Sequence, residues 1–235
     1  MKAKIKDKRE VTKGTLSVDF DLLGNEVNFE PGQYITVRLI NPPFTDAKGS
    51  QRYFSINNPP GQKGVFTITT RIRDSAFKKS LSELPTGTEV EIDPPRGVFV
   101  LPKETIKPLV FIAGGIGITP FLSMLRHIRD GKLDYKITLI YSNKDKESTA
   151  FLQEFEDMAK NNSNFKLIAA ITQDPGWSGE KRRIDAQFIK DYFKNPNDYL
   201  YYAAGPPGMV DAIYDALINA GIGSSNIETE NFAGY

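Results

Sequence analysis

The chain has 235 residues, of which 25% are charged and 40% hydrophobic, and its formal net charge is +1. This balance gives no bulk electrostatic attraction to nucleic acid or to an anionic membrane, and no apolar run approaches the roughly 18 residues of a membrane span. Cysteine is absent, which excludes disulfides, thiolate catalysis and a cysteine-ligated iron–sulfur cluster within this chain.

The first ten residues are charged and contain no hydrophobic signal region, so a cytoplasmic location is expected. From there to about residue 101, hydrophobic and polar residues alternate with period two between turn signals, which predicts short strands. The expected strands are 16–20, 34–39, 65–70 and 89–92. One helix is expected to begin after Ser75, a candidate N-cap, and to end near Leu84. Such regularly spaced strands favour an antiparallel β-barrel.

From Leu109 the pattern changes to strands that alternate with helices, after a linker from Pro102 to Pro108. This alternation predicts a parallel sheet covered by helices. The expected strands are 109–113, 136–141, 165–171, 199–204 and 227–232. The expected helices are 119–130, 148–160, 185–194 and 207–220.

A glycine-rich turn, Gly114–Pro120, follows the first of these parallel strands. Thr119 is a candidate N-cap, and Pro120 fits the first helical position because that position needs no N–H. The helix dipole and the outward N–H groups favour an anion, so a pyrophosphate is the expected ligand. A tight structural turn explains the glycines alone equally well. The single histidine, His127, is expected to be an ordinary helix residue, and no metal site is predicted.

Three further stretches carry residues of a chemical kind that suits a nucleotide cofactor. Arg52-Tyr53-Phe54-Ser55 suits a flavin, although a barrel strand with a solvated arginine is the alternative. The helix start at Ser75–Ser80 offers a second phosphate site or a solvated basic turn. Gly205–Met209 forms another small-residue turn at the carboxyl end of a parallel strand, where open α/β sheets bind ligands.

These stretches, in this order, resemble the ferredoxin–NADP⁺ reductase family of flavoprotein oxidoreductases, over about Lys4 to Tyr235. The family's Arg-x-Tyr-Ser motif resembles Arg52–Ser55, its Gly-Gly-x-Gly-x-Thr-Pro motif matches Gly114–Pro120, and its Cys-Gly-Pro-Pro motif resembles Ala204–Pro207. The resemblance implies a FAD-binding antiparallel Greek-key β-barrel over residues 1–102, followed by a Rossmann-like parallel α/β domain over residues 107–235 that binds NAD(P)H. It also implies hydride transfer between NAD(P)H and flavin N5.

The resemblance assigns roles to particular residues. Ser55 and Glu230 are the candidate catalytic residues, and Phe54 takes the aromatic position against the flavin. The expected FAD contacts are Arg52, Tyr53, Phe54, Ser55, Thr69, Arg71, Lys78, Lys79, Ser80, Phe232 and Tyr235. The expected NAD(P) contacts are Gly114, Gly115, Gly117, Thr119, Pro120, Ser142, Asn143, Lys144, Arg183, Gly205, Pro206 and Met209. The alternative for the last eight residues is a frayed terminus.

Three departures from the family pattern leave a second function open. Phe54 replaces the usual tyrosine, Lys78 stands where many members have a phosphate-binding serine, and Ala204 replaces a cysteine near the nicotinamide. A non-catalytic flavin- or nucleotide-binding regulatory module that keeps the fold is therefore the alternative to an NAD(P)H-dependent flavin oxidoreductase.

The choice of nucleotide and of electron acceptor also stays open. Lys144 and Lys181–Arg183 slightly favour NADPH, although such a charge run is usually a solvated loop. The expected acceptor is a separate protein, namely a ferredoxin, a flavodoxin, an oxygenase component or a haem protein. No nucleic-acid or membrane partner is expected, and the sequence does not indicate an oligomeric state.

Overall fold

The computed structural model describes residues 1–104 and 107–232. The contacts within the chain divide it into two compact units. Unit 1 comprises Met1–Leu101 together with Thr119–Gly131, and unit 2 comprises Pro102–Ile118 together with Lys132–Tyr235. The helix that follows the glycine-rich turn thus groups with the first unit.

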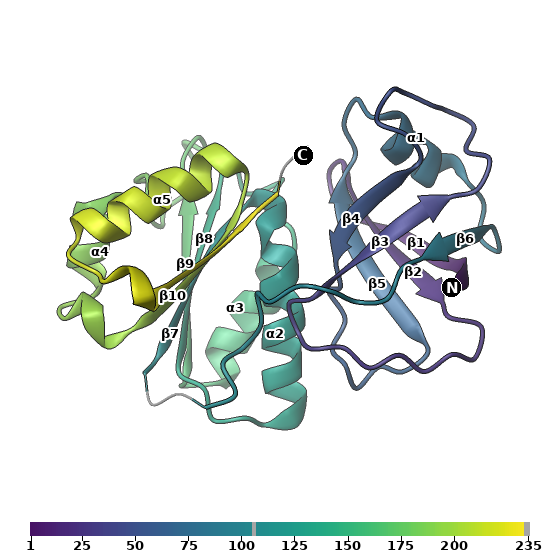
Figure 1. Ribbon diagram of the computed structural model, residues 1–235. Coiled ribbons are helices and arrows are strands. Elements are labelled where there is room, and N and C mark those ends of the chain that lie inside the picture. The colour runs from purple at the N-terminus through teal and green to yellow at the C-terminus, as the bar shows by residue number, and fades with distance from the viewer. Residues whose placement is uncertain (105–106, 233–235) are drawn as a thin grey trace. The chain divides into compact units, whose positions relative to one another are not determined.

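Unit 1 is built on one antiparallel sheet, as the sequence predicts (Figure 1). Its strand order is β4-β3-β6-β1-β2-β5. Two asparagines just after β4 connect this end strand to the other end strand, β5. The Asn57 N–H donates to the Thr67 carbonyl at 2.9 Å, and Asn58 Oδ1 accepts from the Thr67 N–H at 2.7 Å. The strands are β1 (Lys2–Thr12), β2 (Thr15–Asp21), β3 (Tyr34–Leu39), β4 (Gln51–Ser55), β5 (Val65–Arg71) and β6 (Glu89–Ile92).

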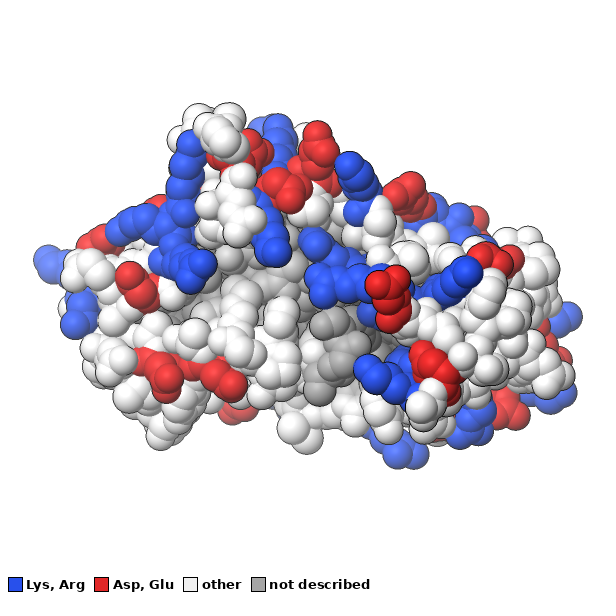
Figure 2. Space-filling model, turned by 90° about the horizontal axis from the view of Figure 1, so that it is seen from above, with Lys and Arg blue, Asp and Glu red and all other residues white. Residues whose placement is uncertain are grey.

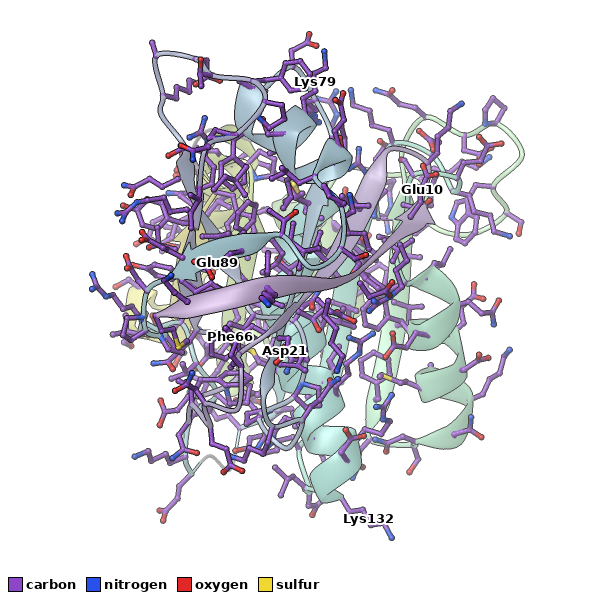
Figure 3. The ribbon with its side chains drawn as sticks, turned by 90° about the vertical axis from the view of Figure 1, so that its right-hand side faces the viewer. Glu10, Asp21, Phe66, Lys79, Glu89 and Lys132 are labelled. Atoms are coloured by element: carbon purple, nitrogen blue, oxygen red, sulfur yellow. The ribbon has the colours of Figure 1, made fainter. Side chains whose placement is uncertain are left out.

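The longest strand of the sheet, β1, is not predicted by the hydrophobic pattern, and neither is β4. Charged residues dominate the sequence of β1, and only Ala3 and Ile5 are fully buried. In Figure 3, β1 crosses the front of the view, with Glu89 of β6 beside its start and Glu10 near its end. Hydrogen bonds to β6 and β2 therefore hold this strand in place despite its polar composition.

Two helices belong to unit 1. Helix α1 (Ala76–Glu83) begins after Ser75, whose side chain accepts from the Lys78 N–H, so the predicted N-cap is confirmed. Helix α2 (Ile118–Gly131) begins one residue before Thr119, so the predicted Thr119 N-cap is wrong. A 3₁₀ turn, η1 (Gly115–Gly117), precedes it, and the carbonyls of that turn accept the Ile118 N–H in place of a capping side chain.

Helix α2 is tied to the barrel through backbone carbonyls just past β4. Ser123 Oγ donates to the Asn58 carbonyl at 2.8 Å, and Arg126 donates to the Asn57 carbonyl at 3.1 Å. The Phe121 ring also meets the Phe99 ring edge-on at 5.6 Å. These contacts explain why residues 119–131 group with unit 1.

Unit 2 is a parallel sheet in the order β11-β10-β7-β8-β9 (Figure 1). Helices α4 (Ala186–Tyr192) and α5 (Pro207–Asn219) cover one face, where Phe188 and Ile213 pack among the strand residues. Helix α3 (Leu152–Asn161) covers the other face, where Phe155 meets Tyr141. The strands are β7 (Leu109–Gly114), β8 (Ile137–Asn143), β9 (Phe165–Ile171), β10 (Leu200–Gly205) and β11 (Ile227–Asn231).

Helix α3 begins four residues later than the sequence predicts. The expected start at 148 is wrong because Asp145 caps a separate turn: its Oδ1 accepts from the Ser148 N–H at 2.7 Å, and its carbonyl accepts from Thr149 Oγ1 at 2.7 Å. Phe151 then adopts a left-handed φ of 61°, and the helix starts at Leu152. Within the part of the chain that the structure describes, no helix is long and apolar enough to cross a membrane.

Candidate functional site

Two turns at the carboxyl ends of β7 and β10 pack directly against each other in unit 2. An added Cβ at Gly114 would stand 2.0 Å from Met209 Sδ, and one at Gly117 would stand 2.2 Å from the Ala204 carbonyl oxygen. Gly117 faces backbone and must be glycine for the turns to meet, whereas Gly114 faces the flexible end of the Met209 side chain. The strand order reverses between β7 and β10, which is where open parallel sheets bind ligands.

Gly115 has a different role from its two neighbouring glycines. Its φ is +53°, in the left-handed region, and an added Cβ would meet nothing within 4 Å. The Tyr141 hydroxyl donates to the Gly115 carbonyl at 3.2 Å and so fixes the turn from β8. Open backbone directly before a helix is the arrangement that an anion requires. Gly115 is therefore the residue of this motif that leaves room for a phosphate.

The second turn leads from β10 into α5. Gly205 is buried with a φ of +156°, Pro206 is exposed, and Pro207 occupies the first turn of the helix, as predicted. The Phe232 N–H donates to the Gly205 carbonyl at 2.9 Å, which holds the end of the described chain against this turn. By contrast, Thr119 and Pro120 of the first motif are buried in α2 within unit 1.

Glu230 lies on β11, opposite Ala204 of β10 in the parallel register. Its Oε2 is buried and has no hydrogen-bond partner among the residues that the structure describes. Burial raises the pKa of this carboxyl to about 7. A carboxyl with this pKa can hold or release a proton at neutral pH, which is a property of catalytic carboxyls.

The end of β8 carries three of the expected nucleotide contacts. Ser142 pairs in register with Gly114 and is half-buried, Asn143 is only 6% exposed, and Lys144 is exposed. The loop after β9 joins this end of the strand: the Thr172 N–H donates to the Asn143 carbonyl at 3.0 Å, and the Gln173 N–H donates to the Lys144 carbonyl at 2.7 Å.

Further along that loop, two of the three basic residues 181–183 form ion pairs or hydrogen bonds with neighbouring protein groups. Arg182 forms ion pairs with Glu180 at 2.9 Å and with Asp191 at 2.6 Å. Hydrogen bonding from Arg182 lowers the pKa of the Glu180 carboxyl to about 2. Lys181 Nζ donates to the Pro175 carbonyl at 3.0 Å, and Arg183 is exposed.

In unit 1, the expected flavin motif lies on β4 at the edge of the sheet. Ser55, at the end of the strand, is 6% exposed and pairs with Tyr34 of β3. Phe54 is 2% exposed and packs on Phe77 of α1 at 5.7 Å, so a flavin ring would reach it only if this packing opened. Tyr53 is 60% exposed, and its ring meets the Tyr34 ring edge-on at 5.8 Å.

Arg52 lies at the start of this motif and is held by the preceding loop. Its Nη1 donates to the carbonyls of Lys48 and Gly49, each at 3.0 Å, and its Nη2 lies 3.5 Å from Asp46 Oδ1. The guanidinium also stands 5.4 Å from the centre of the Phe77 ring. The backbone thus orients this arginine next to the start of α1.

Several cations crowd the N-terminal end of α1. Lys78 is 4% exposed, and burial together with the charges of Arg73, Arg52 and Lys48 lowers its pKa to about 8. The sequence had indicated Arg52 and Lys78, but not Lys48 and Arg73, because neither belongs to a motif. Like charges repel, so this cation cluster (Lys48, Arg52, Arg73 and Lys78) is suited to a bound anion.

The other expected FAD contacts of unit 1 have roles inside the unit. Ser80 Oγ accepts from the Phe44 N–H at 3.0 Å and donates to its carbonyl at 3.1 Å. Thr69 Oγ1 accepts from Asn57 Nδ2 and donates to Ser17 Oγ. Lys79 stands 3.9 Å from the Phe44 ring centre and lies on α1 at the upper edge of Figure 3. Arg71 ends β5 and is half-buried, and Tyr235 lies outside the described residues.

A pocket of about 460 Å³ opens beside the loop that holds Arg52. It lies in the size range of ligand pockets and shares Gly49 with the arginine's hydrogen-bond partners. Its lining residues are Leu39, Asn41, Pro42, Phe44, Thr45, Gly49 and Ser50.

Comparisons with known proteins agree with this geometry. Residues 111–215 match the family described as "Oxidoreductase NAD-binding domain". The chain is 27% identical to the terephthalate 1,2-dioxygenase reductase component 1 of Comamonas sp, over 90% of this chain and 61% of that protein. The chain therefore spans about three-fifths of the length of this relative.

Two solved structures share the fold. Phthalate dioxygenase reductase is 27% identical with a TM-score of 0.76, over 98% of this chain and 67% of that chain. The flavohem-like FAD/NAD-binding domain of nitric oxide dioxygenase from Vibrio cholerae O1 biovar El Tor has a TM-score of 0.87 at 18% identity and covers 98% of both chains. The family match over residues 111–215, the relatives and the two-unit fold together support the resemblance to the ferredoxin–NADP⁺ reductase-like flavoprotein oxidoreductases.

Proposed function

We propose that this chain binds FAD through unit 1 and NAD(P)H through unit 2, and transfers electrons from the nucleotide to a separate protein acceptor. The observation that carries this proposal is the cation cluster at the start of α1. The four cations of the cluster outnumber Asp46, the carboxylate that pairs with Arg52, so the cluster favours a further anion. The FAD pyrophosphate supplies that charge, and the pocket beside Gly49 is suited to its adenosine end.

When bound, the two cofactors would supply the redox chemistry, with NAD(P)H as hydride donor and flavin N5 as hydride acceptor. The protein's residues bind and orient the two groups. Arg52 and Lys78 neutralise the FAD pyrophosphate, Tyr53 presents its open ring to the flavin, and Ser55 donates a hydrogen bond to N5. The open backbone at Gly115 receives the NAD(P)H pyrophosphate. Glu230 holds or releases a proton beside the turn after β10.

The acceptor is proposed from the relatives. The terephthalate relative is the reductase component of a dioxygenase, and one solved neighbour is part of a nitric oxide dioxygenase. We therefore propose an oxygenase component or a haem protein as the electron acceptor, in preference to a ferredoxin or a flavodoxin. The face drawn in Figure 2 carries both Lys and Arg and Asp and Glu.

A regulatory module is the second candidate function, and two observations favour it. Phe54 is packed into unit 1, and Ala204, which is 1% exposed, has no thiol at the end of β10. This candidate predicts a bound flavin that NAD(P)H does not reduce.

The flavin half of the proposal is tested by FAD binding to the apoprotein of a Lys78→Met variant. Removing the buried cation is expected to weaken FAD binding by about tenfold or more, because a charge-assisted hydrogen bond is lost. Lys13→Met, which removes an exposed lysine from the β1–β2 turn, is the matched control and should bind FAD as the unmodified protein does. Equal FAD affinity of the Lys78→Met variant would contradict the assignment of the cation cluster.

A further inference from the structure

Helix α2 carries a serine on its buried side, where packing alone would favour an apolar residue. Ser123 is 0% exposed and lies between Leu122 and Met124, which are also 0% exposed. A buried hydroxyl needs a hydrogen-bond partner, and within a helix it commonly uses a carbonyl of the preceding turn. The Ser123 hydroxyl instead donates outside its helix, to the Asn58 carbonyl at 2.8 Å. This side chain therefore holds the chain segment that follows β4.

Arg126 lies three residues further along the same helix and binds the neighbouring peptide group. Its Nη1 donates to the Asn57 carbonyl at 3.1 Å. Residues three apart are neighbours on a helix surface, so Ser123 and Arg126 together hold two successive carbonyls. Both carbonyls belong to the three residues that directly follow Ser55.

The same three residues are also held from the sheet. The Ile56 N–H donates to the Gln33 carbonyl, and the Asn57 N–H donates to the Thr67 carbonyl, both at 2.9 Å. Asn58 Oδ1 accepts from the Thr67 N–H at 2.7 Å. The sheet thus holds two N–H groups of the segment, whereas α2 holds two of its carbonyls. The bonds from α2 come from side chains, so each of them can be removed without altering a strand.

The placement of this segment decides where the Ser55 hydroxyl lies. Ser55 ends β4 and is 6% exposed. β4 is an end strand of its sheet and pairs with β3, so its last residue is held from one side. A serine side chain has a single rotatable bond before its oxygen, so the hydroxyl reaches a given atom only when the backbone is correctly placed. A misplacement of about 1 Å at a reacting centre can cost about 100-fold in rate.

We propose that Ser123 and Arg126 are positioning residues that hold the Ser55 hydroxyl within reach of flavin N5. They act through the two carbonyls that they bind, and neither side chain touches the flavin. The proposal rests on the proposed function, in which Ser55 donates a hydrogen bond to N5. It adds that two side chains of α2, about 70 residues away along the chain, control the rate at which the flavin is reduced.

The first test measures amide hydrogen exchange of the full-length protein without flavin. Ser123→Ala removes the hydroxyl with little change of volume, so the segment after Ser55 is expected to exchange about tenfold faster. Arg126→Met should act on the same segment. Arg129→Met removes an exposed arginine from the same helix, so as the control it should leave this exchange unchanged. Unchanged exchange in both Ser123→Ala and Arg126→Met would overturn the proposal.

The second test is a double-mutant cycle on flavin reduction in the FAD-loaded protein. At saturating NAD(P)H, Ser123→Ala should slow reduction about tenfold in stopped-flow kinetics, while the FAD dissociation constant stays within about twofold. Ser55→Ala should slow reduction at least as much. The double variant should be no slower than Ser55→Ala, because the position of a hydroxyl has no effect once the hydroxyl is removed. Arg126→Lys keeps a donor and should recover part of the rate that Arg126→Met loses.

The outcomes separate this inference from the proposed function. Additive effects of Ser123→Ala and Ser55→Ala would overturn the inference alone, because α2 would then affect the rate without acting through Ser55. A Ser123→Ala variant that loses stability but keeps its amide exchange and its reduction rate would have a purely structural serine, which also overturns the inference. An unmodified protein whose bound flavin is reduced by neither NADH nor NADPH would overturn the inference together with the proposed function.

Discussion

Glu230 is the residue whose protonation in the folded protein differs most clearly from that of an exposed carboxyl. Burial raises its pKa from an ordinary 4.5 to about 7. Between these values the folded protein holds a proton that the unfolded chain releases. The free energy of unfolding is therefore expected to fall as pH rises from about 4.5 to 7, by at most roughly 3 kcal/mol.

Glu230→Gln tests this dependence, because an amide cannot ionise. Thermal unfolding between pH 5 and pH 8 should show a smaller loss of stability in the variant, which should be the more stable protein at pH 8. Glu228→Gln, on the same strand but exposed, is the control and should keep the unmodified pH dependence. Parallel curves for the unmodified protein and Glu230→Gln would show that burial does not perturb this carboxyl.

For single residues, the sequence predicts a role correctly where that role depends only on residues nearby in the chain. Ser75 caps α1 as predicted, because a serine before a helix needs only its own turn to act. Thr119 does not cap α2, because the preceding 3₁₀ turn already satisfies the helix start. The contributions of Lys48 and Arg73 to the cation cluster arise from chain segments far apart in sequence, so no local pattern reveals them.

Among the secondary-structure elements, helix α1 is held at its C-terminal end by a lysine of strand β1. Lys8 Nζ of β1 donates to the carbonyls of Ser82 and Leu84 at 2.6 and 2.5 Å. These carbonyls would otherwise lack partners, and a cation suits the negative end of the helix dipole. Lys8→Met is expected to lower the free energy of unfolding by about 1–2 kcal/mol.

Chemical denaturation of the whole protein, followed by circular dichroism, measures this effect. Lys6→Met removes an exposed lysine from the same strand and should leave stability within about 0.5 kcal/mol of the unmodified protein. Equal stability of the Lys8 and Lys6 variants would mean that the carbonyls at the end of α1 are satisfied by water.

The glycine-rich turn gives a second prediction for an element. Gly117→Ala places a Cβ 2.2 Å from the Ala204 carbonyl oxygen, so one of the two turns must move and unit 2 should lose more than about 2 kcal/mol. Gly115→Ala meets no atom and should cost only about 1 kcal/mol for its left-handed φ. Its added methyl group stands where phosphate is expected, so it should weaken NAD(P)H binding.

Thermal unfolding and nucleotide titration of both variants separate the two roles. The expected pattern is a large loss of stability for Gly117→Ala and a loss of affinity with little loss of stability for Gly115→Ala. The opposite pattern would exchange the roles assigned to the two glycines.

The elements themselves were largely predictable, because strands such as β3 and β9 show clear hydrophobic patterns and are bounded by turn residues. Two exceptions have different causes. β1 is polar and becomes a strand only through pairing with β2 and β6. The start of α3 is delayed by the turn that Asp145 caps, which resembles the first turn of a helix in sequence.

For the whole molecule, the grouping of residues 119–131 with unit 1 means that this unit extends beyond its six-stranded sheet to include most of α2. A fragment of residues 1–101 would lack the Phe121, Ser123 and Arg126 contacts and would expose the surface beneath α2. We expect this fragment to be less stable than the barrel in the full chain, or unfolded, by circular dichroism and hydrogen exchange. A fragment that unfolds cooperatively at the same temperature as the full chain would contradict this prediction.

The sequence predicts the class of both units but not this grouping. Residues 107–235 read as one continuous strand–helix pattern, and hydrophobic spacing within α2 does not show which unit its apolar side contacts. The resemblance to the reductase family, by contrast, depends on motifs in fixed order along the chain. It was therefore available from the sequence alone.

The measurement that tests the central claim most directly is the visible spectrum of the purified protein during anaerobic titration with NADH and then NADPH. The account predicts flavin absorption bands that bleach on addition of reduced nucleotide. A flavin that stays oxidised with both nucleotides would favour the regulatory module. A protein that binds no flavin after incubation with FAD would contradict the account.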